Sequence, residues 1–253
     1  FLFLVTLAAC GGSESAEEYL SQAKAYLAQS EYKAATIELK NALRLDPDSA
    51  EARWLLGKVY LDTGDILAAE KELERSRSLG WNADEVRPAL AQALLAQGKF
   101  AEVLGLEHKD LGPAAASELL SSKALAELAG GKVSKAEKLV ALALEKDPQA
   151  DDAKLVEARL LASQGDTTGA LIVLEEVLEV TPDSAQAWRL KGDILMQQGV
   201  LEEARAAFDQ SITHSQVAYG DRVKRALINL QLQDYEAAQA DATELLRLSP
   251  QHP

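Results

Sequence analysis

The chain of 253 residues carries 40 acidic and 26 basic side chains, which gives a formal net charge of -14. An acidic surface repels phosphate backbones, so this charge argues against nucleic-acid binding as a primary role. Ala, Leu, Glu, Gln and Lys are abundant and aromatic residues make up only 5% of the chain, a composition that favours helices. The sequence therefore predicts an all-α protein before any periodicity is considered.

Residues 1–9 (FLFLVTLAA) form an apolar segment that ends at Cys10, the only cysteine. The segment is too short to cross a bilayer as a helix, which needs about 20 residues, but it suits the apolar part of a signal peptide. The run from Leu7 to Cys10 resembles the bacterial lipobox, whose cysteine is lipidated and becomes the first residue of the mature protein. We expect a partial lipoprotein signal peptide at 1–9, lipidation at Cys10 and a tether at 10–15. The alternative is a partly buried apolar segment with an incidental thiol.

A lipid at Cys10 would place the protein in the bacterial cell envelope, facing the periplasm. No Asp follows the cysteine, and resemblance to lipoprotein sorting rules then implies the outer membrane over the inner one. A chain with a single cysteine forms no internal disulfide, so an oxidising compartment poses no problem.

Glycine and proline recur along the chain with one shared period. Gly64, Gly98, Gly131, Gly165 and Gly199 follow one another at intervals of 34, 33, 34 and 34 residues, and prolines 148, 182 and 250 fit a frame of 34 with one interval skipped. A period of this length indicates stacked helical hairpins. With each proline at the thirty-second place, we expect about seven units within an array spanning 16–253, starting near 16, 50, 84, 117, 151, 185 and 219.

Small residues occupy fixed places within these units. In the second unit, residues 50–65 and 66–79 predict two helices, with Gly57 on the first facing Ala69 and Leu73 on the second. The places resemble the tetratricopeptide-repeat (TPR) pattern W-x₂-L-G-x₂-Y…A-x₃-F…P, and the sixth unit matches it with Gly192 and Phe208. This resemblance implies an all-α, right-handed superhelical solenoid of about seven TPR hairpins. No capping helix follows the last unit, so we expect the chain to be the N-terminal piece of a longer array.

The connectors between units contain capping signals. Asp48 with Glu51 after Pro47, and Asp183 with Gln186 after Pro182, predict the starts of the helices that follow. Trp81 and Gln216 stand where the frame expects proline.

The third unit departs from the frame, because residues 105–113 (GLEHKDLGP) interrupt its second helix. Two interpretations of these departures remain open. They are ordinary drift at loop positions, which tolerate change, or the irregular loop bends the superhelix or makes a contact of its own.

The sequence offers no constellation for catalysis or metal binding. His108, His214 and His252 are far apart and lack ligand spacing with Cys10, and paired acids such as residues 151–152 and 175–176 are typical of solvated helix faces. Phosphate-binding glycine motifs are absent. We therefore predict a protein that is not an enzyme, with no metal and no cofactor.

Binding of a protein or peptide is the remaining function, on the concave face that the first helices of stacked hairpins line. The lysine and asparagine clamp of chaperone-binding TPR domains is missing at the corresponding places. Helix phase alone gives these candidate groove residues: Trp54, Lys58, Arg159, Arg189, Asp193 and Met196.

The stretch from Leu7 to Leu104, with its lipobox, immediate first repeat and shortened third unit, resembles the TPR-repeat lipoproteins of the PEP-CTERM protein-sorting and exopolysaccharide system. That resemblance implies a lipid-anchored scaffold for biofilm matrix production or export of sorted proteins. The alternative is a TPR lipoprotein that assists assembly, in the manner of a pilotin or an outer-membrane protein assembly factor. An enzyme built on a helical array is a more distant alternative.

Overall fold

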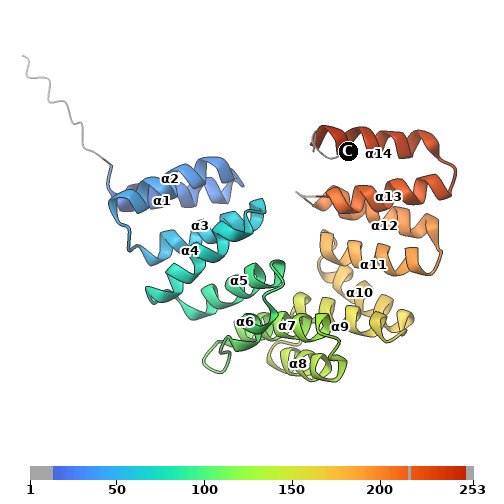
Figure 1. Ribbon diagram of the computed structural model, residues 1–253, viewed down its shortest axis with the longest axis horizontal. Helices are drawn as coiled ribbons and strands as arrows, with labels where there is room; N and C mark the ends of the chain where they lie inside the picture. Colours follow the sequence, from blue (N-terminus) through green and yellow to red (C-terminus); the bar gives the residue numbers. More distant parts are fainter. Residues whose placement is uncertain (1–13, 216–217, 249–253) are drawn as a thin grey trace, which may run out of the picture. The chain divides into compact units, whose positions relative to one another are not determined.

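The computed structural model describes residues 14–215 and 218–248, and every regular element in these ranges is an α-helix (Figure 1). The all-α prediction is thus confirmed. The chain forms two compact units, residues 1–115 and 116–253, whose boundary falls in the first turn of α7. The expected signal segment, Cys10 and most of the expected tether lie outside the described residues.

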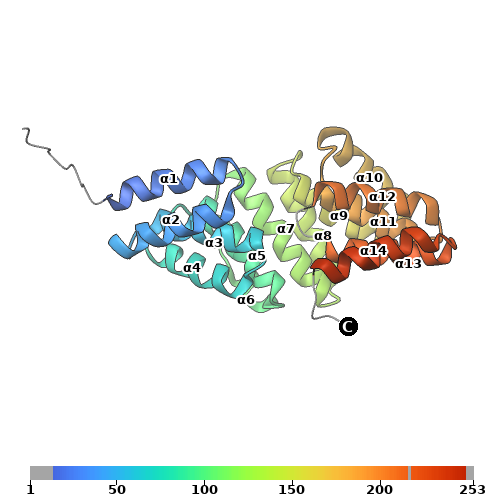
Figure 2. The same ribbon diagram turned by 90° about the horizontal axis from the view of Figure 1, so that it is seen from above.

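Unit 1 is a series of helical hairpins in which α1 packs against α2, α3 against α4, and α5 against the short α6 (Figures 1 and 2). Successive hairpins pack through α2 with α3 and α4 with α5. The helices are α1 (Ala16–Ala28), α2 (Tyr32–Leu45), α3 (Ala50–Thr63), α4 (Ile66–Ser78), α5 (Ala83–Ala96) and α6 (Phe100–Gly105).

Unit 2 continues the same arrangement, with α9 against α10, α11 against α12 and α13 against α14. Its first helix starts at Pro113, four residues before the start that the repeat frame gives the fourth unit. The helices are α7 (Pro113–Ala129), α8 (Val133–Lys146), α9 (Asp151–Ser163), α10 (Thr167–Val180), α11 (Ala185–Gln197), α12 (Leu201–His214), α13 (Tyr219–Gln231) and α14 (Tyr235–Leu248).

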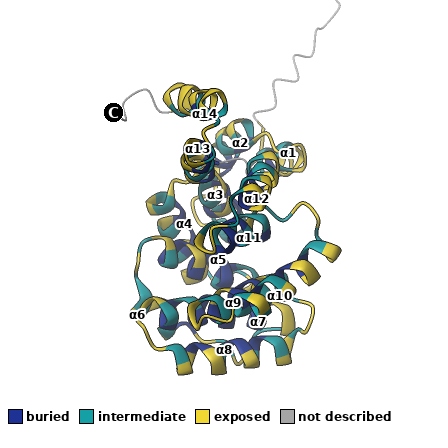
Figure 3. Cartoon of the chain, turned by 90° about the vertical axis from the view of Figure 1, so that its right-hand side faces the viewer, coloured by how far each residue is buried: buried dark blue, intermediate teal, exposed yellow. Residues whose placement is uncertain are grey.

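The two helices of a hairpin approach most closely at the small residues. A Cβ atom on Gly57 would lie 2.6 Å from Cγ of Leu73, and a Cβ atom on Gly192 would lie 3.0 Å from the ring of Phe208. Leu73 and Phe208 are fully buried. Buried residues line the helix contacts and exposed ones the outer sides, as Figure 3 shows for α8. The small residues read from the sequence therefore set the spacing within a hairpin.

The turn between the two helices of a hairpin uses the left-handed backbone region at one fixed place. Glycine fills this place in five hairpins, with φ between 71° and 88°. In the first and last hairpins the same place holds Ser30 (φ 58°) and Gln233 (φ 62°). Residues with a side chain cost about 1–2 kcal/mol in this region, so the two end hairpins contain strained turns.

We predict opposite effects of glycine exchange at this place. Gln233→Gly should raise the free energy of unfolding by up to about 1 kcal/mol, and Gly165→Ala should lower it by about 1 kcal/mol, because only glycine adopts this φ without strain. The control is Gly220→Ala in the first turn of α13, where an added Cβ atom meets nothing within 4 Å, and this change should not destabilise. Urea denaturation of the three variants measures these changes, and a destabilising Gln233→Gly would contradict the argument.

The helix caps differ from those that the sequence predicts. Ser49 caps α3 by accepting a hydrogen bond from the amide of Ala52, and Ser184 caps α11 by accepting one from Ala187. The predicted caps Asp48 and Asp183 were wrong by one residue. Both α3 and α11 begin one residue later than caps at the two aspartates would require. Asp48 instead forms an ion pair with Arg75 at 2.6 Å.

Two of the hairpins that lack the frame proline, the second and the sixth, share a hydrogen bond between their helices. The hydroxyl of Ser76 in α4 donates to the carbonyl of Ala50 at 2.8 Å, and that of Ser211 in α12 donates to the carbonyl of Ala185 at 3.0 Å. Both serines are fully buried and occupy the same place of the frame. A hydrogen bond from the second helix to the start of the first thus accompanies the missing proline.

The irregular segment after α6 makes contacts of its own within unit 1. Arg87 of α5 holds Asp110 with two hydrogen bonds, of 2.5 and 2.9 Å, and donates to the carbonyl of Glu107. The amide of Gly112 donates to Asp84 at 2.9 Å. Of the two interpretations, the structure favours the one in which this segment forms specific contacts.

Ion pairs also join consecutive hairpins. Lys99 binds Glu70 at 2.6 Å, and its hydrogen bond holds the pKa of that carboxyl below the usual range. In unit 2, Arg205 and Asp234 occupy the same places of the repeat with the charges exchanged, at 3.5 Å.

The last hairpin has a polar interior. Arg225 of α13 donates to Asp209 of α12 at 2.6 Å and forms two hydrogen bonds with Asp241 of α14. Asp241 is 2% exposed, as is Asn229 beside it. The two hydrogen bonds to Asp241, more than the one to Asp209, raise the pKa of Arg225. Charge pairing therefore replaces part of the apolar packing at this end of unit 2.

Candidate protein-interaction surface

The surface of interest is formed by the exposed side chains of the first helix of each hairpin, here called the first-helix face. In unit 1 it belongs to α1, α3 and α5, and in unit 2 to α9, α11 and α13. All six groove residues predicted from the sequence lie on these helices. They fall into two groups, one in each unit.

In unit 1 the predicted residues Trp54 and Lys58 belong to one aromatic cluster. The ring centroids of Trp54 and Trp81 lie 5.8 Å apart, and the ammonium of Lys58 lies 5.2 Å from the Trp54 ring. Both indole N–H groups donate to Glu85, from Trp54 to its carbonyl at 3.3 Å and from Trp81 to its carboxylate at 2.7 Å. Trp81, which stands in the place of a proline, thus joins the second hairpin to the third.

In unit 2 the predicted residues Arg189 and Asp193 form ion pairs between α11 and α13. Nε of Arg189 donates to both carboxylate oxygens of Asp221, at 2.8 and 2.9 Å, and Asp221 is only 2% exposed. Lys224 donates to Asp193 at 2.5 Å, and its ammonium also lies 5.5 Å from the Phe208 ring. These two charged residues therefore hold consecutive hairpins together, and their charges are largely neutralised within the protein.

Apolar side chains lie next to these ion pairs on α13. Leu227 and Leu230 are 49% and 50% exposed, and Val223 is half-buried. The three residues are spaced i, i+4 and i+7 and so lie on one side of the helix. Met196 of α11 is partly buried against the core cluster that contains Ile228. We call Val223, Leu227 and Leu230 the α13 stripe.

Arg159 of α9 is exposed, and the described residues provide it with no ion pair. It lies on the helix that packs against α11, which carries Arg189, Asp193 and Met196. Arg159 and Lys58 are thus the two charged residues among the six for which the described residues provide no ion pair.

Leu227 and Leu230 were missed by the sequence reasoning. The repeat frame could have identified them as groove residues, because in the last unit they occupy the places that Lys58 and Leu61 occupy in the second. They were missed since two leucines at helical spacing are more often core residues, and only exposure distinguishes the two cases.

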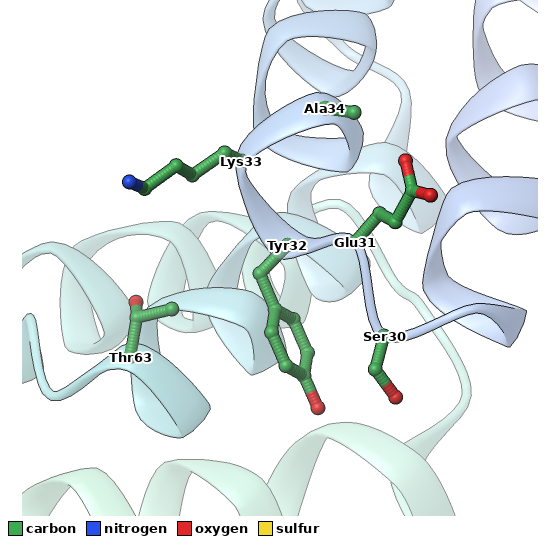
Figure 4. Close-up of a pocket in the computed structure, with 6 residues that line it drawn as sticks. All are labelled: Ser30, Glu31, Tyr32, Lys33, Ala34 and Thr63. Atoms are coloured by element: carbon green, nitrogen blue, oxygen red, sulfur yellow. The ribbon is translucent and has the colours of Figure 1, made fainter. Parts of the chain in front are cut away.

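Unit 1 contains a cavity of about 520 Å³ at the α1–α2 turn and the end of α3 (Figure 4). In Figure 4 the Tyr32 ring lies between Ser30 and Thr63, and the side chain of Lys33 points away from Glu31. The lining includes neither a histidine nor a cysteine. The cavity therefore lies at the edge of the hairpins, away from the predicted groove residues Trp54 and Lys58, which are not in its lining.

Across residues 14–215 and 218–248, no group of three His, Cys, Asp or Glu side chains is placed to hold a metal ion. His108 and His214 lie in different units, and His252 is outside the described residues. In the same ranges no helix is long and apolar enough to cross a membrane.

Family models described as tetratricopeptide repeats match most of the chain. One matches residues 121–179 and 155–218, a second matches 23–64, and a third matches 222–252.

Known proteins resemble the chain in sequence or in fold. It is 25% identical over 249 residues to DnaJ homolog subfamily C member 3 from Rattus norvegicus, covering 97% of this chain and 45% of the relative; the chain thus spans about half the length of this relative. A tetratricopeptide-repeat protein from Parabacteroides merdae has a TM-score of 0.61 at 17% identity, with 94% of each chain covered. A structure of IFIT1 with m7Gppp-AAAA has a TM-score of 0.69 at 14% identity, covering 93% of this chain and 59% of that one. Both structures show likeness of fold alone.

Proposed function

Because the chain is built of tetratricopeptide repeats, a fold that serves protein and peptide binding, we propose that it is a lipid-anchored, non-catalytic scaffold of the bacterial cell envelope. In this proposal it binds protein partners in exopolysaccharide production and PEP-CTERM protein sorting and export. The observation that carries the binding role is the exposed α13 stripe in unit 2. The pathway rests on the resemblance of residues 7–104, and the anchor rests on Cys10 in its lipobox.

The α13 stripe has the properties of a binding surface. It exposes apolar area next to ion pairs that are already satisfied within the protein, so a partner that covers it buries leucine side chains without stranding Lys224 or Asp193. Apolar residues at i, i+4 and i+7 match the spacing of a helix that lies in a groove. The uncompensated charge of Arg159 provides a polar contact for a partner carboxylate.

The binding role is tested by capture from the cell envelope with stripe variants. Leu227→Lys with Leu230→Lys should abolish retention of the partner, because charges replace the apolar contacts. Both side chains are half exposed, so stability should change by no more than about 0.5 kcal/mol, which circular dichroism on heating checks. The control Ile172→Lys changes an exposed isoleucine of α10 and should retain the partner.

The identity of the captured protein tests the pathway. Components of exopolysaccharide synthesis or PEP-CTERM substrates support the proposal. Pilus, secretin or outer-membrane barrel subunits would contradict it and favour the assembly role. Partners retained equally by the stripe variant would contradict the location of the site.

A further inference from the structure

The outer sides of α2 and α4 in unit 1 carry two exposed stripes of unusual charge. On α2 the exposed residues are spaced i, i+4, i+7 and i+11, and on α4 they are spaced i, i+4, i+8 and i+11, so each set lies on one side of its helix. The residues are Lys33, Ile37, Lys40 and Arg44 on α2, and Leu67, Lys71, Arg75 and Ser78 on α4. We call them together the basic outer stripes.

The basic outer stripes contain five cations and no carboxylate. Arg75 pairs with Asp48 at 2.6 Å, and Lys40 lies 5.8 Å from the ring of Tyr60. Among the described residues, Lys33 and Lys71 have neither an ion pair nor a hydrogen bond from their ammonium groups. On the flank of α4, Arg77 and Glu74 neutralise each other at 2.7 Å. Positive charge therefore remains exposed on this side of unit 1.

On α10 and α12 of unit 2, the same places of the repeat carry glutamates and no cation. The exposed residues on the outer sides there are Thr168, Ile172, Glu175, Glu176 and Glu179 on α10, and Glu202, Ala206, Gln210 and Thr213 on α12. In a chain with a net charge of -14, the α2 and α4 stripes are thus locally positive, unlike the outer sides of α10 and α12. A local field of this sign attracts an anionic surface.

Exposed apolar residues lie within the same stripes. Leu67 is 72% exposed and Ile37 is 59% exposed. Each sits one turn from a lysine, Ile37 after Lys33 and Leu67 before Lys71. Basic residues interleaved with single large apolar side chains are typical of surfaces that lie in the headgroup region of an anionic bilayer.

We propose that the basic outer stripes of α2 and α4 rest on a membrane surface that contains anionic phospholipid headgroups. The orientation rests on the proposed lipid anchor, because residues 10–15 can span at most about 20 Å. Tyr19 near the start of α1 and Leu43 near the end of α2 pack on the same core cluster. The N-terminal end of α1 therefore lies beside the Arg44 end of the stripe. The lysines then lie among the phosphates, with Ile37 and Leu67 between them.

The test uses the full chain with Cys10→Ala, which removes any acyl anchor, and sedimentation with lipid vesicles. The protein should bind vesicles of phosphatidylcholine mixed with phosphatidylglycerol, and added salt should weaken this binding. Lys33→Gln with Lys71→Gln should reduce the binding constant by about 25-fold, since each basic residue near an anionic surface contributes a factor of about 5. Equal binding to pure phosphatidylcholine vesicles would overturn the proposal.

Matched controls come from the same places in unit 2. Lys138→Gln removes an exposed lysine of α8 from the place that Lys71 occupies in α4, and it should leave vesicle binding unchanged. Ile37→Ser should weaken binding, whereas Ile172→Ser, at the same place in α10 and 54% exposed, should not. Equal losses from both members of either pair would overturn the proposal.

A second copy of the chain is the competing occupant, because its acidic α10 and α12 surfaces complement the stripes. Sedimentation velocity without vesicles distinguishes the two. A salt-sensitive dimer that Lys33→Gln with Lys71→Gln dissociates would overturn the membrane proposal. Capture through the α13 stripe is measured on other residues, so either proposal can fail without the other.

Discussion

Replacing Arg225 with methionine should lower the free energy of unfolding by about 3 kcal/mol, because it leaves Asp241 buried without its main partner. Asp241 is 2% exposed and receives two hydrogen bonds from Arg225. Arg222, at 3.8 Å from the same carboxylate, keeps the loss near the lower end of the range for a broken buried pair. Urea denaturation measures the loss, and hydrogen exchange should show α13 and α14 opening first.

A double variant separates the burial of an unpaired charge from simple loss of packing. Arg225→Leu with Asp241→Leu removes both charges and should recover most of the lost stability, because a buried ion pair replaced by apolar residues is often neutral or stabilising. Asp209, the other partner, is 49% exposed on its side chain and can be hydrated. A double variant as unstable as Arg225→Met would contradict this explanation.

Phe208→Ala should cost about 3–5 kcal/mol, because it empties the centre of the hairpin formed by α11 and α12. Phe208 is fully buried and packs against α11 at Gly192, and its ring lies 5.5 Å from the ammonium of Lys224. The midpoint of urea denaturation should fall strongly. Tyr235→Ala is the aromatic control, since Tyr235 is 65% exposed, and it should change stability by no more than about 0.5 kcal/mol.

Gly192→Ala provides a second measure of the same contact. A Cβ atom at this position would lie 3.0 Å from the Phe208 ring, so overpacking should cost about 1–3 kcal/mol. Phe208→Leu gives the alanine side chain room. The double variant should therefore lose less stability than the sum of the losses in the two single variants. Strictly additive losses would mean that the two residues do not share a contact.

The hairpins could be predicted from the sequence because their signals are local and repeated. Gly57 and Gly192 mark the close approach of two helices, and the glycine of each turn marks a left-handed backbone. The fifteenth residue of a unit adopts left-handed backbone angles even where it is Ser30 or Gln233. The fold therefore imposes this conformation, and glycine only lowers its conformational strain. The predicted caps Asp48 and Asp183 were wrong because each aspartate is followed by a serine that can also cap a helix. The sequence alone does not fix which residue is the first helical one.

The surface was harder to predict because it depends on pairs that are distant in sequence. Arg189 pairs with Asp221 and Asp193 with Lys224, each about one repeat apart. Helix phase identified the first member of each pair as a groove residue but could not show that its charge is already neutralised. The exposure of Leu227 depends in the same way on what packs around α13.

Site-specific photo-cross-linking in cells tests directly whether the repeats bind a protein through the first-helix face. A photoreactive amino acid at Leu227 and, separately, one at Ile172 compare the α13 stripe with the outer side of α10 in the same unit. We expect a discrete cross-linked protein from position 227 and none from position 172. Cross-links from position 172 alone, or the same product from both, would contradict binding through the first-helix face.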